Sequence, residues 1–139
     1  MKRNNTIPTT IAVIAAVVIT AIVLLFLGVG GGIEYQFGDS SFSIHTSLWK
    51  DQTVTYTDII DFELRDYVDV GKRTNGYGSS KLNLGTFQNS EFNTYQLYSY
   101  VERREFIVLQ LKDNTILVIN GEDRNATQDI FEEMTLRIK

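Results

Sequence analysis

The chain contains no cysteine, a single histidine and a single proline among its 139 residues. Without cysteine it has neither a disulfide framework nor a thiolate nucleophile. A zinc site or a Ser-His-Asp triad needs several groups of matching chemistry, which the one histidine, His45, does not supply. The sequence also lacks the GxSxG, HExxH and paired-acid motifs of common hydrolases. We therefore expect a protein that is not an enzyme and that uses neither a cofactor nor a metal ion.

Positive charge is scarce after residue 32. Because Lys2 and Arg3 precede this point, residues 33–139 contain 11 Lys and Arg against all 17 Asp and Glu, a formal charge of −6. Such an acidic segment repels nucleic acid and anionic lipid surfaces, so we expect no nucleic-acid partner. Its length is sufficient for one small domain with its own hydrophobic core.

One long apolar run occupies the N-terminal part of the chain. Residues 11–29 are nineteen consecutive positions without charge. As a helix they would be about 29 Å long, which matches the ~30 Å hydrocarbon thickness of a bilayer. The run predicts a transmembrane helix over residues 9–31, after an N-terminal flank of residues 1–8 and before a domain over residues 32–139. The alternative is a cleaved signal peptide, although the apolar region of such a peptide is usually shorter.

The charges that flank this run predict its orientation. Lys2 and Arg3 precede the run, whereas the next basic residue along the chain is Lys50. Cations near a membrane span are retained on the cytoplasmic side. We therefore expect a single-pass protein of the cell membrane with a cytoplasmic N-terminus and an extracytoplasmic C-terminal domain.

Alternation of apolar and polar residues predicts strands in most of the domain. Residues 33–37 and 42–44 predict a hairpin with its turn at Gly38-Asp39, and a further strand surrounds Val54. Residues 95–120 predict a three-stranded antiparallel meander with short loops. The clearest alternation lies in a strand that places one set of residues inward and another outward: Ile60, Phe62 and Leu64 against Asp61, Glu63 and Arg65.

Residues 66–92 differ from the rest of the domain. They carry four glycines and an Asn75-Gly76 dipeptide, which is a strong signal for a tight turn. We expect an irregular excursion with one short strand around residues 81–84. Such excursions are uncommon in compact domains and are often functional.

The last segment predicts an amphipathic helix. Asn125 is the expected N-cap, and apolar residues recur at every fourth position, at Ala126, Ile130, Met134 and Ile138. This stripe must pack against the sheet. The sequence thus predicts a mainly β (α+β) domain of about seven antiparallel strands, with its open end covered by a C-terminal helix.

Several segments resemble motifs of a bacterial pleckstrin-homology (PH) family of membrane-anchored proteins. They are Arg73–Tyr77 (RTNGY), Leu84–Phe87 (LGTF), Tyr95–Tyr98 (YQLY) and Val118–Asn120 (VIN), and Thr127 with Phe131 is similar to the family's last helix. The resemblance covers residues 33–138 and departs from the family at Asp69–Gly71, where members often carry proline. It implies a PH-like barrel with a C-terminal capping helix, held at a membrane and without an established activity.

The familiar mode of ligand binding by PH domains is phosphoinositide capture by basic residues in the first hairpin loop. Several phosphates require several charge-assisted donors that converge on one point. Here that loop is Gly38–Ser41, which contains Asp39 and no cation. We therefore expect no phosphoinositide binding.

The candidate ligand-binding residues are Lys72, Arg73 and Asn75. A loop with two cations and free backbone amides is able to cradle a phosphate or a carboxylate. The alternative is that Arg73 braces the loop by pairing with a carboxylate such as Glu63 or Asp66, a role that suits a planar guanidinium.

Other chemically suggestive residues have ordinary interpretations beside the functional ones. His45 lies on a predicted strand and is expected at the surface. The acidic run between Asp58 and Asp69 is typical of solvated charge, although a calcium site is the alternative. Trp49, Tyr98 and Tyr100 form either an aromatic patch for a peptide or a sugar, or part of the core and the sheet surface.

These features together favour a non-enzymatic module. We expect a membrane-anchored PH-like domain that binds another protein or envelope material, or serves as a scaffold, outside the membrane. Two alternatives stay open at this point. One is a small cell-envelope enzyme, and the other is a structural membrane protein that self-associates through its span or a sheet edge.

Overall fold

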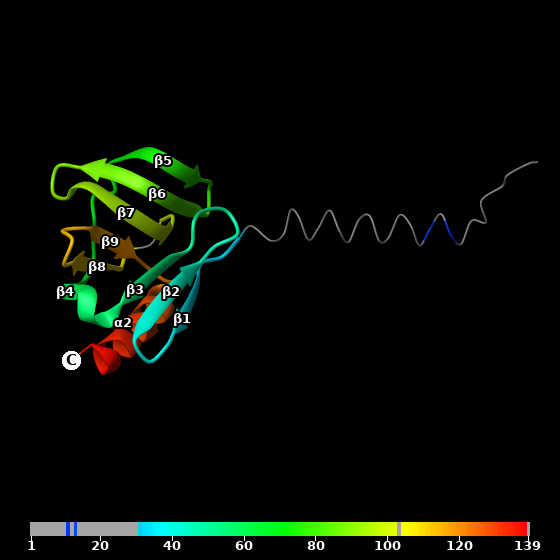
Figure 1. Ribbon diagram of the computed structural model, residues 1–139. Helices are drawn as coiled ribbons and strands as arrows, with labels where there is room; N and C mark the ends of the chain where they lie inside the picture. The colour runs from blue at the N-terminus through cyan, green and yellow to red at the C-terminus, as the bar shows by residue number, and fades with distance from the viewer. Residues whose placement is uncertain (1–10, 12, 14–30, 103, 139) are drawn as a thin grey trace, which may run out of the picture. The chain divides into compact units, whose positions relative to one another are not determined.

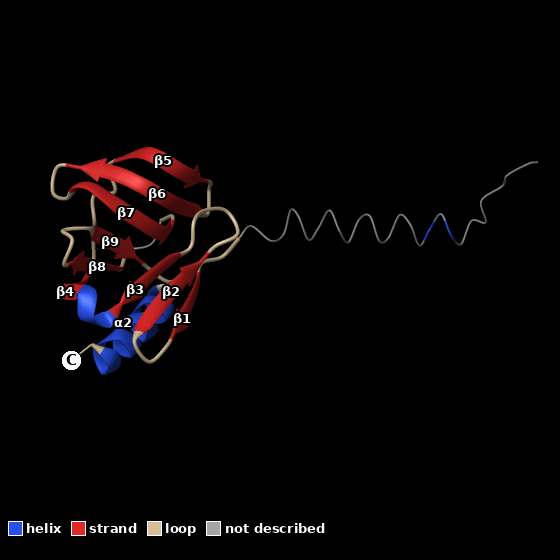
Figure 2. Cartoon of the chain, viewed as in Figure 1, coloured by secondary structure: helices blue, strands red, loops and turns tan. Residues whose placement is uncertain are grey.

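The computed structural model describes residues 11, 13, 31–102 and 104–138. Residues 31–139 form one compact unit, which is built mainly of strands (Figures 1 and 2). The predicted transmembrane helix over residues 9–31 lies almost wholly outside the described residues. Within the described part of the chain, no helix is long and apolar enough to cross a membrane.

The described residues form nine strands, one short 3-10 helix and one C-terminal α-helix. The strands are β1 (Glu34–Phe37), β2 (Ser41–His45), β3 (Gln52–Thr55), β4 (Ile59–Arg65), β5 (Lys72–Gly78), β6 (Leu82–Asn89), β7 (Asn93–Tyr100), β8 (Phe106–Leu111) and β9 (Ile116–Ile119). The helices are η1 (Tyr56–Asp58) and α2 (Arg124–Arg137). The domain is therefore mainly β with a C-terminal helix, as predicted.

The strands belong to two separate sheets instead of one closed barrel. The first has the order β1-β2-β3 and the second the order β4-β8-β9-β7-β6-β5. The expectation of about seven antiparallel strands is corrected in two respects, because there are nine strands and β7 runs parallel to β9. A hairpin joins β8 to β9 and inserts β9 between β8 and β7. The predicted meander of three consecutive antiparallel strands is therefore wrong.

Residues 66–92 contain two long strands, β5 and β6, where an irregular excursion was expected. Gly76 and Gly85 face each other in register across the two strands, with φ angles of 131° and 127°. A Cβ atom on Gly85 would lie 2.6 Å from the Cα atom of Gly76, so only glycine permits this approach. Asn75-Gly76 thus lies inside a bulged strand and is not a turn. The glycines that indicate turns in the sequence here allow two strands to pair closely.

Strand β4 follows the predicted alternation only in part. Its register shifts between Ile59 and Asp61, which takes Ile60 out of the alternation and leaves its side chain 57% exposed. Leu64 is 36% exposed because β4 is an edge strand. Phe62 alone of the predicted inward set packs well, against Phe131 of α2 with 5.3 Å between ring centroids.

The hydrophobic core has two parts, one on each face of the six-stranded sheet. The first part lies among the two sheets and α2 and contains Phe42, Ile107 and Met134. The second part is covered by residues 66–71, which we call the strap, because this segment crosses the sheet from edge strand β4 to edge strand β5. Val68 of the strap is 3% exposed and packs with Phe106.

Hydrogen bonds hold the strap against the sheet. The Tyr95 hydroxyl donates to the carbonyl oxygen of Val70 (2.7 Å), and the Asn89 side-chain amide donates to the carbonyl oxygen of Asp69 (2.6 Å). These bonds satisfy backbone oxygens that no strand partner serves. The strap therefore has a defined path although it has no regular secondary structure.

Helix α2 begins two residues earlier than the sequence predicts. Its N-cap is Asp123, whose carboxylate accepts a hydrogen bond from the backbone N–H of Ala126 (2.8 Å). Asn125, the predicted cap, lies inside the helix. The predicted apolar stripe is confirmed, because Ile130 and Met134 are 8% and 0% exposed within the first part of the core.

Candidate functional site

The three candidate ligand-binding residues all lie on edge strand β5, but they do not converge. Lys72 pairs in register with Gln88, Arg73 with Phe87 and Asn75 with Thr86. Residues paired in register project from the same face, and successive residues of a strand alternate between faces. Arg73 therefore shares the strap side of the sheet with Phe87, and Lys72 projects to the opposite side. Asn75 also projects to the opposite side, because the bulge between Arg73 and Asn75 interrupts the alternation and pairs Asn75 with Thr86. A single cradle made by all three side chains is not formed.

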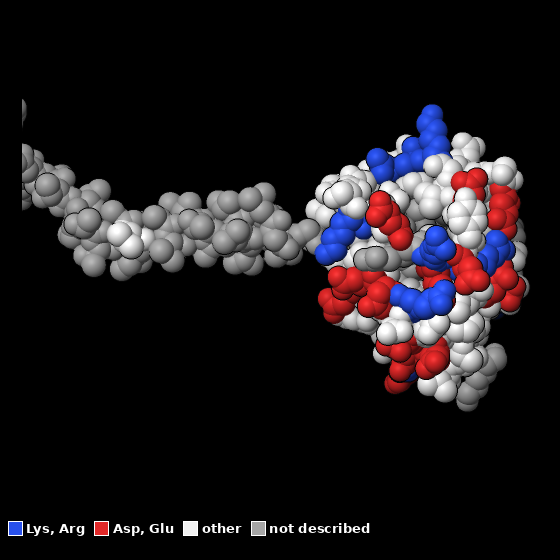
Figure 3. All heavy atoms as spheres, turned by 180° about the vertical axis from the view of Figure 1, so that it is seen from behind, with Lys and Arg blue, Asp and Glu red and all other residues white. Residues whose placement is uncertain are grey.

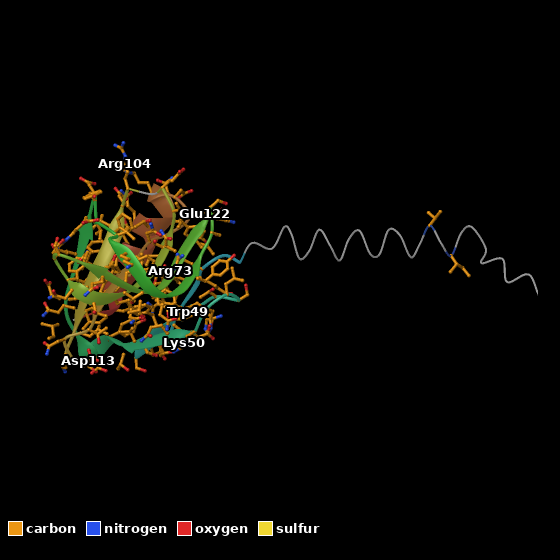
Figure 4. All side chains as sticks on the ribbon, turned by 90° about the horizontal axis from the view of Figure 1, so that it is seen from above. Trp49, Lys50, Arg73, Arg104, Asp113 and Glu122 are labelled. Carbon is orange, nitrogen blue, oxygen red and sulfur yellow. The ribbon has the colours of Figure 1, made fainter. Side chains whose placement is uncertain are left out.

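The Arg73 guanidinium lies along the strap side of β5. A side chain at Gly78 would overlap the guanidinium, so the guanidinium rests where that residue has no side chain. The guanidinium carbon is 6.0 Å from the ring centroid of Phe87, a cation–π geometry that helps to position it. Figure 4 shows Arg73 over the strands, away from Arg104 and Asp113 at the periphery.

Arg73 does not brace a loop in the way that the sequence suggests as an alternative. Glu63 pairs with Arg65, and Asp66 approaches Arg124 at 3.9 Å. Of the five arginines that the structure describes, three form ion pairs, namely Arg65, Arg124 and Arg137. Among the described residues Arg73 has no carboxylate within ion-pair distance. Its guanidinium is thus exposed and available to an external anion.

A groove of about 260 Å³ lies on the same side of the sheet, next to the strap. We call it the strap groove. Its apolar walls come from Val68, Val70 and Phe106, and its polar groups are those of Asn83, Ser99 and Glu102. Tyr67 of the strap, 73% exposed, stands at its rim. The groove therefore combines apolar surface with a few polar groups, which is the usual make-up of a ligand site.

The polar groups of the groove continue toward Arg73. Gly78, Asn83 and Ser99 are register partners on β5, β6 and β7, so they form one row across three strands. Because the Arg73 guanidinium fills the space above Gly78, the row presents a guanidinium, a carboxamide and a hydroxyl in succession. The row offers several hydrogen-bond donors to an anionic oxygen.

Ser99 is the buried member of this row. Its side chain is on the strap side, because Tyr98 and Tyr100 belong to the core part on the other face. Ser99 is 1% exposed and lines the groove. Its hydroxyl therefore belongs to the wall of the groove. Sequence reasoning missed Ser99 and Asn83, because their position is apparent only once the strap and the strand register are known.

The other candidates take structural positions. His45 lies at the surface as predicted, and its Nδ1 is 2.9 Å from a carboxylate oxygen of Asp51. This hydrogen bond lowers the pKa of the Asp51 carboxyl below its ordinary value. Tyr98 and Tyr100 are buried in the core: the Tyr98 hydroxyl donates to the carbonyl oxygen of Lys50 (2.9 Å), and that of Tyr100 accepts from the N–H of Ile33 (2.9 Å). Tyr98 and Tyr100 therefore do not form an exposed aromatic patch with Trp49.

The acidic run between Asp58 and Asp69 is spread along β4 and the strap. Among residues 31–102 and 104–138, no three His, Asp or Glu side chains are grouped so as to hold a metal ion. On the face seen in Figure 3, acidic and basic side chains alternate over the surface instead of gathering in one cationic patch. The structure thus presents a surface of mixed charge on this face (Figure 3).

The comparisons with known proteins add no family to this geometry. The resemblance to the bacterial PH family rests on the motifs around Arg73–Tyr77 and Leu84–Phe87, and it stays a prediction. No protein-family model, no curated protein and no solved structure matches the chain.

Proposed function

We propose that the protein is a single-pass membrane protein whose extracytoplasmic, PH-like domain is a non-enzymatic binding module or scaffold. The apolar run of residues 11–29 and the cations Lys2 and Arg3 support the membrane anchor and its orientation. The PH-like assignment is supported by the order of elements, since strands of two sheets are followed by one C-terminal helix that packs into the core.

The binding role is supported by the strap groove and by Arg73 beside it, which has no ion-pair partner among the described residues. In a domain with a formal charge of −6, an exposed arginine normally finds a carboxylate, as Arg65 does. The groove is built on strands and on a hydrogen-bonded strap, so its groups are held in fixed positions. Preorganised donors of this kind favour recognition of a partner.

A hydrolytic role is less well supported. A serine nucleophile needs a general base within hydrogen-bond reach. The chain has one histidine, His45, which lies on β2 and is engaged by Asp51. Ser99 lies on β7 of the six-stranded sheet, whereas His45 belongs to the three-stranded sheet. The geometry around Ser99 therefore suits binding better than nucleophilic catalysis.

Self-association is the second candidate. Strand β5 is an edge strand of seven residues, and six of its residues are exposed. An edge of this length presents free backbone donors and acceptors to another strand. Pairing of two β5 strands would join two copies of the chain without using the strap groove.

Photo-crosslinking in intact membranes distinguishes these possibilities. A photoreactive residue at Tyr67, on the rim of the groove, is compared with one at Leu136, on α2; the two side chains are 73% and 75% exposed. We expect an adduct of one discrete additional mass from Tyr67 and none from Leu136. A third probe at Thr74 on β5 would report self-association as an adduct of twice the chain mass. Equal adducts from Tyr67 and Leu136, or none from either, would contradict a binding module centred on the groove.

A further inference from the structure

We propose that the strap groove binds the free C-terminal carboxylate of a short peptide, with Arg73 as the carboxylate-binding residue. This inference rests on the proposed binding function and names the ligand class of the same site. Four features of the described residues lead to it: the Arg73 guanidinium, the row of polar groups beside it, the apolar walls, and the charge at the rim.

Arg73 is suited to a carboxylate ligand by the shape of its guanidinium and because no carboxylate of the described residues pairs with it. Its guanidinium rests over Gly78 and near the Phe87 ring, which leaves its outer edge open to solvent. A guanidinium binds a carboxylate through two parallel hydrogen bonds, a match of shape that a lysine does not offer. The ion pairs of Arg65 and Arg124 show that other guanidiniums of this domain already take carboxylate partners.

The other members of the polar row are placed to contact the peptide groups that precede the carboxylate. Asn83 and Ser99 lie one and two strands away from Gly78, which is about 5 Å and about 10 Å at ordinary strand spacing. Successive peptide groups of an extended chain are separated by roughly 3.5 Å. A carboxylate on Arg73 therefore places the last peptide group near the Asn83 carboxamide. The next peptide group then lies within reach of the Ser99 hydroxyl, which lines the groove.

The apolar walls favour a peptide over a bare anion. Val68, Val70 and Phe106 line the groove beside the polar row. They offer a surface for an apolar side chain of the last residues of a peptide, and burial of that surface adds to the affinity. An inorganic anion would leave these walls exposed to water.

The charge at the rim disfavours ligands of high negative charge. Glu102 is exposed and lines the groove, and the domain as a whole carries a formal charge of −6. A phosphate group at neutral pH carries close to two negative charges, whereas a peptide carboxylate carries one. No Lys or Arg of the described residues lines the groove itself, so Arg73, which lies beside it over Gly78, supplies one positive charge for one carboxylate.

The test uses the full chain, labelled with ¹⁵N in detergent micelles, and a pair of synthetic probes. The probes are N-acetyl-alanyl-leucine as the free acid and the same peptide as its C-terminal amide. We expect the free acid to shift the backbone amide signals of Asn83 and Ser99 in a saturable way, and the amide to bind at least tenfold more weakly. Arg73→Gln should reduce binding of the free acid by at least tenfold.

Lys72→Gln is the matched control, because it removes the same charge from the neighbouring residue on the opposite face of β5. It should leave binding of the free acid within twofold of the unmodified chain. Equal binding of acid and amide, or equal losses in Arg73→Gln and Lys72→Gln, would overturn the proposal. Displacement of the peptide by an equal concentration of inorganic phosphate would also overturn it, because the site would then be a general anion site. The amide spectrum of each variant shows directly whether the domain is folded.

The two proposals fail in different ways. An adduct from Tyr67 in membranes, without any effect of the free acid on Asn83 and Ser99, would retain the binding module and reject the carboxylate ligand. Saturable binding of the free acid, without any adduct from Tyr67, would retain the ligand and reject a protein partner at the groove in the membrane.

Discussion

Replacement of Met134 by alanine tests whether α2 is an integral part of the domain. Met134 is 0% exposed and lies in the core part among the two sheets and the helix. Removal of a buried methionine side chain costs about 2–5 kcal/mol of unfolding free energy, the range reflecting how far the site collapses around the cavity. A domain of this size is stable by only about 5–15 kcal/mol. We therefore expect Met134→Ala to remove a large share of the stability.

Leu136→Ala is the matched control within the same helix. Leu136 is 75% exposed, so its truncation removes little buried surface, and alanine is at least as good a helix former as leucine. We expect a change within about 0.5 kcal/mol for this variant. Phe131→Ala should lie between the two, because its half-buried ring packs on Phe62.

The assay is urea unfolding of the full chain in mild detergent, followed by the fluorescence of Trp49. Trp49 is the one tryptophan of the chain and packs against the core that contains Met134, so its signal reports on this domain. We expect a lower midpoint for Met134→Ala at an unchanged slope, and a melting temperature lowered by at least about 8 °C. Equal midpoints for Met134→Ala and Leu136→Ala would refute the view that α2 completes the core.

The remaining predictions concern pH and topology. Burial, with a smaller effect of the Asp51 charge, raises the pKa of Tyr98 to about 12, whereas a tyrosine in the unfolded chain titrates near pH 10. The stability that this neutral phenol contributes is full below pH 10 and is lost as the pH rises toward 12, so Tyr98→Phe should lose less stability than the unmodified chain between pH 9 and pH 11 in urea melts. An equal loss would contradict this. A reporter that is active only outside the cytoplasm, fused after Lys139, should be active, and an inactive fusion beside an active cytoplasmic reporter would reverse the proposed orientation.

Local patterns in the sequence predicted the elements whose partners are also local. The β1–β2 hairpin and the buried stripe of α2 follow from alternation and from the four-residue repeat, and both are confirmed. Strands β5 and β6 were missed because their glycines indicate turns, while Gly76 and Gly85 serve a close approach between strands that no single segment reveals. The parallel β7–β9 pair depends on contacts between distant segments, and alternation carries no information on them.

The candidate site was predicted in the same partial way. Arg73 was identified from its neighbours in sequence, but the bulge between Arg73 and Asn75, which places Asn75 on the opposite face, depends on the pairing of β5 with β6. Ser99 has no local signal, since a serine in an alternating strand is an ordinary residue. It becomes notable only because Val68 and Val70 of the strap bury that face of the sheet.

The position of β4 at one edge of the six-stranded sheet has a consequence for the order in which the domain can assemble. The only strand partner of β4 in the described part of the chain is β8, and all of β5, β6 and β7 lies between them in sequence. During synthesis β5, β6 and β7 can pair with their immediate neighbours, whereas β4 stays single until Leu111 is made. Closure of so long a loop is entropically costly and slows folding. The backbone of β4 therefore stays unpaired in the nascent chain, and the strap that follows β4 takes its final position only after β8 has been synthesised.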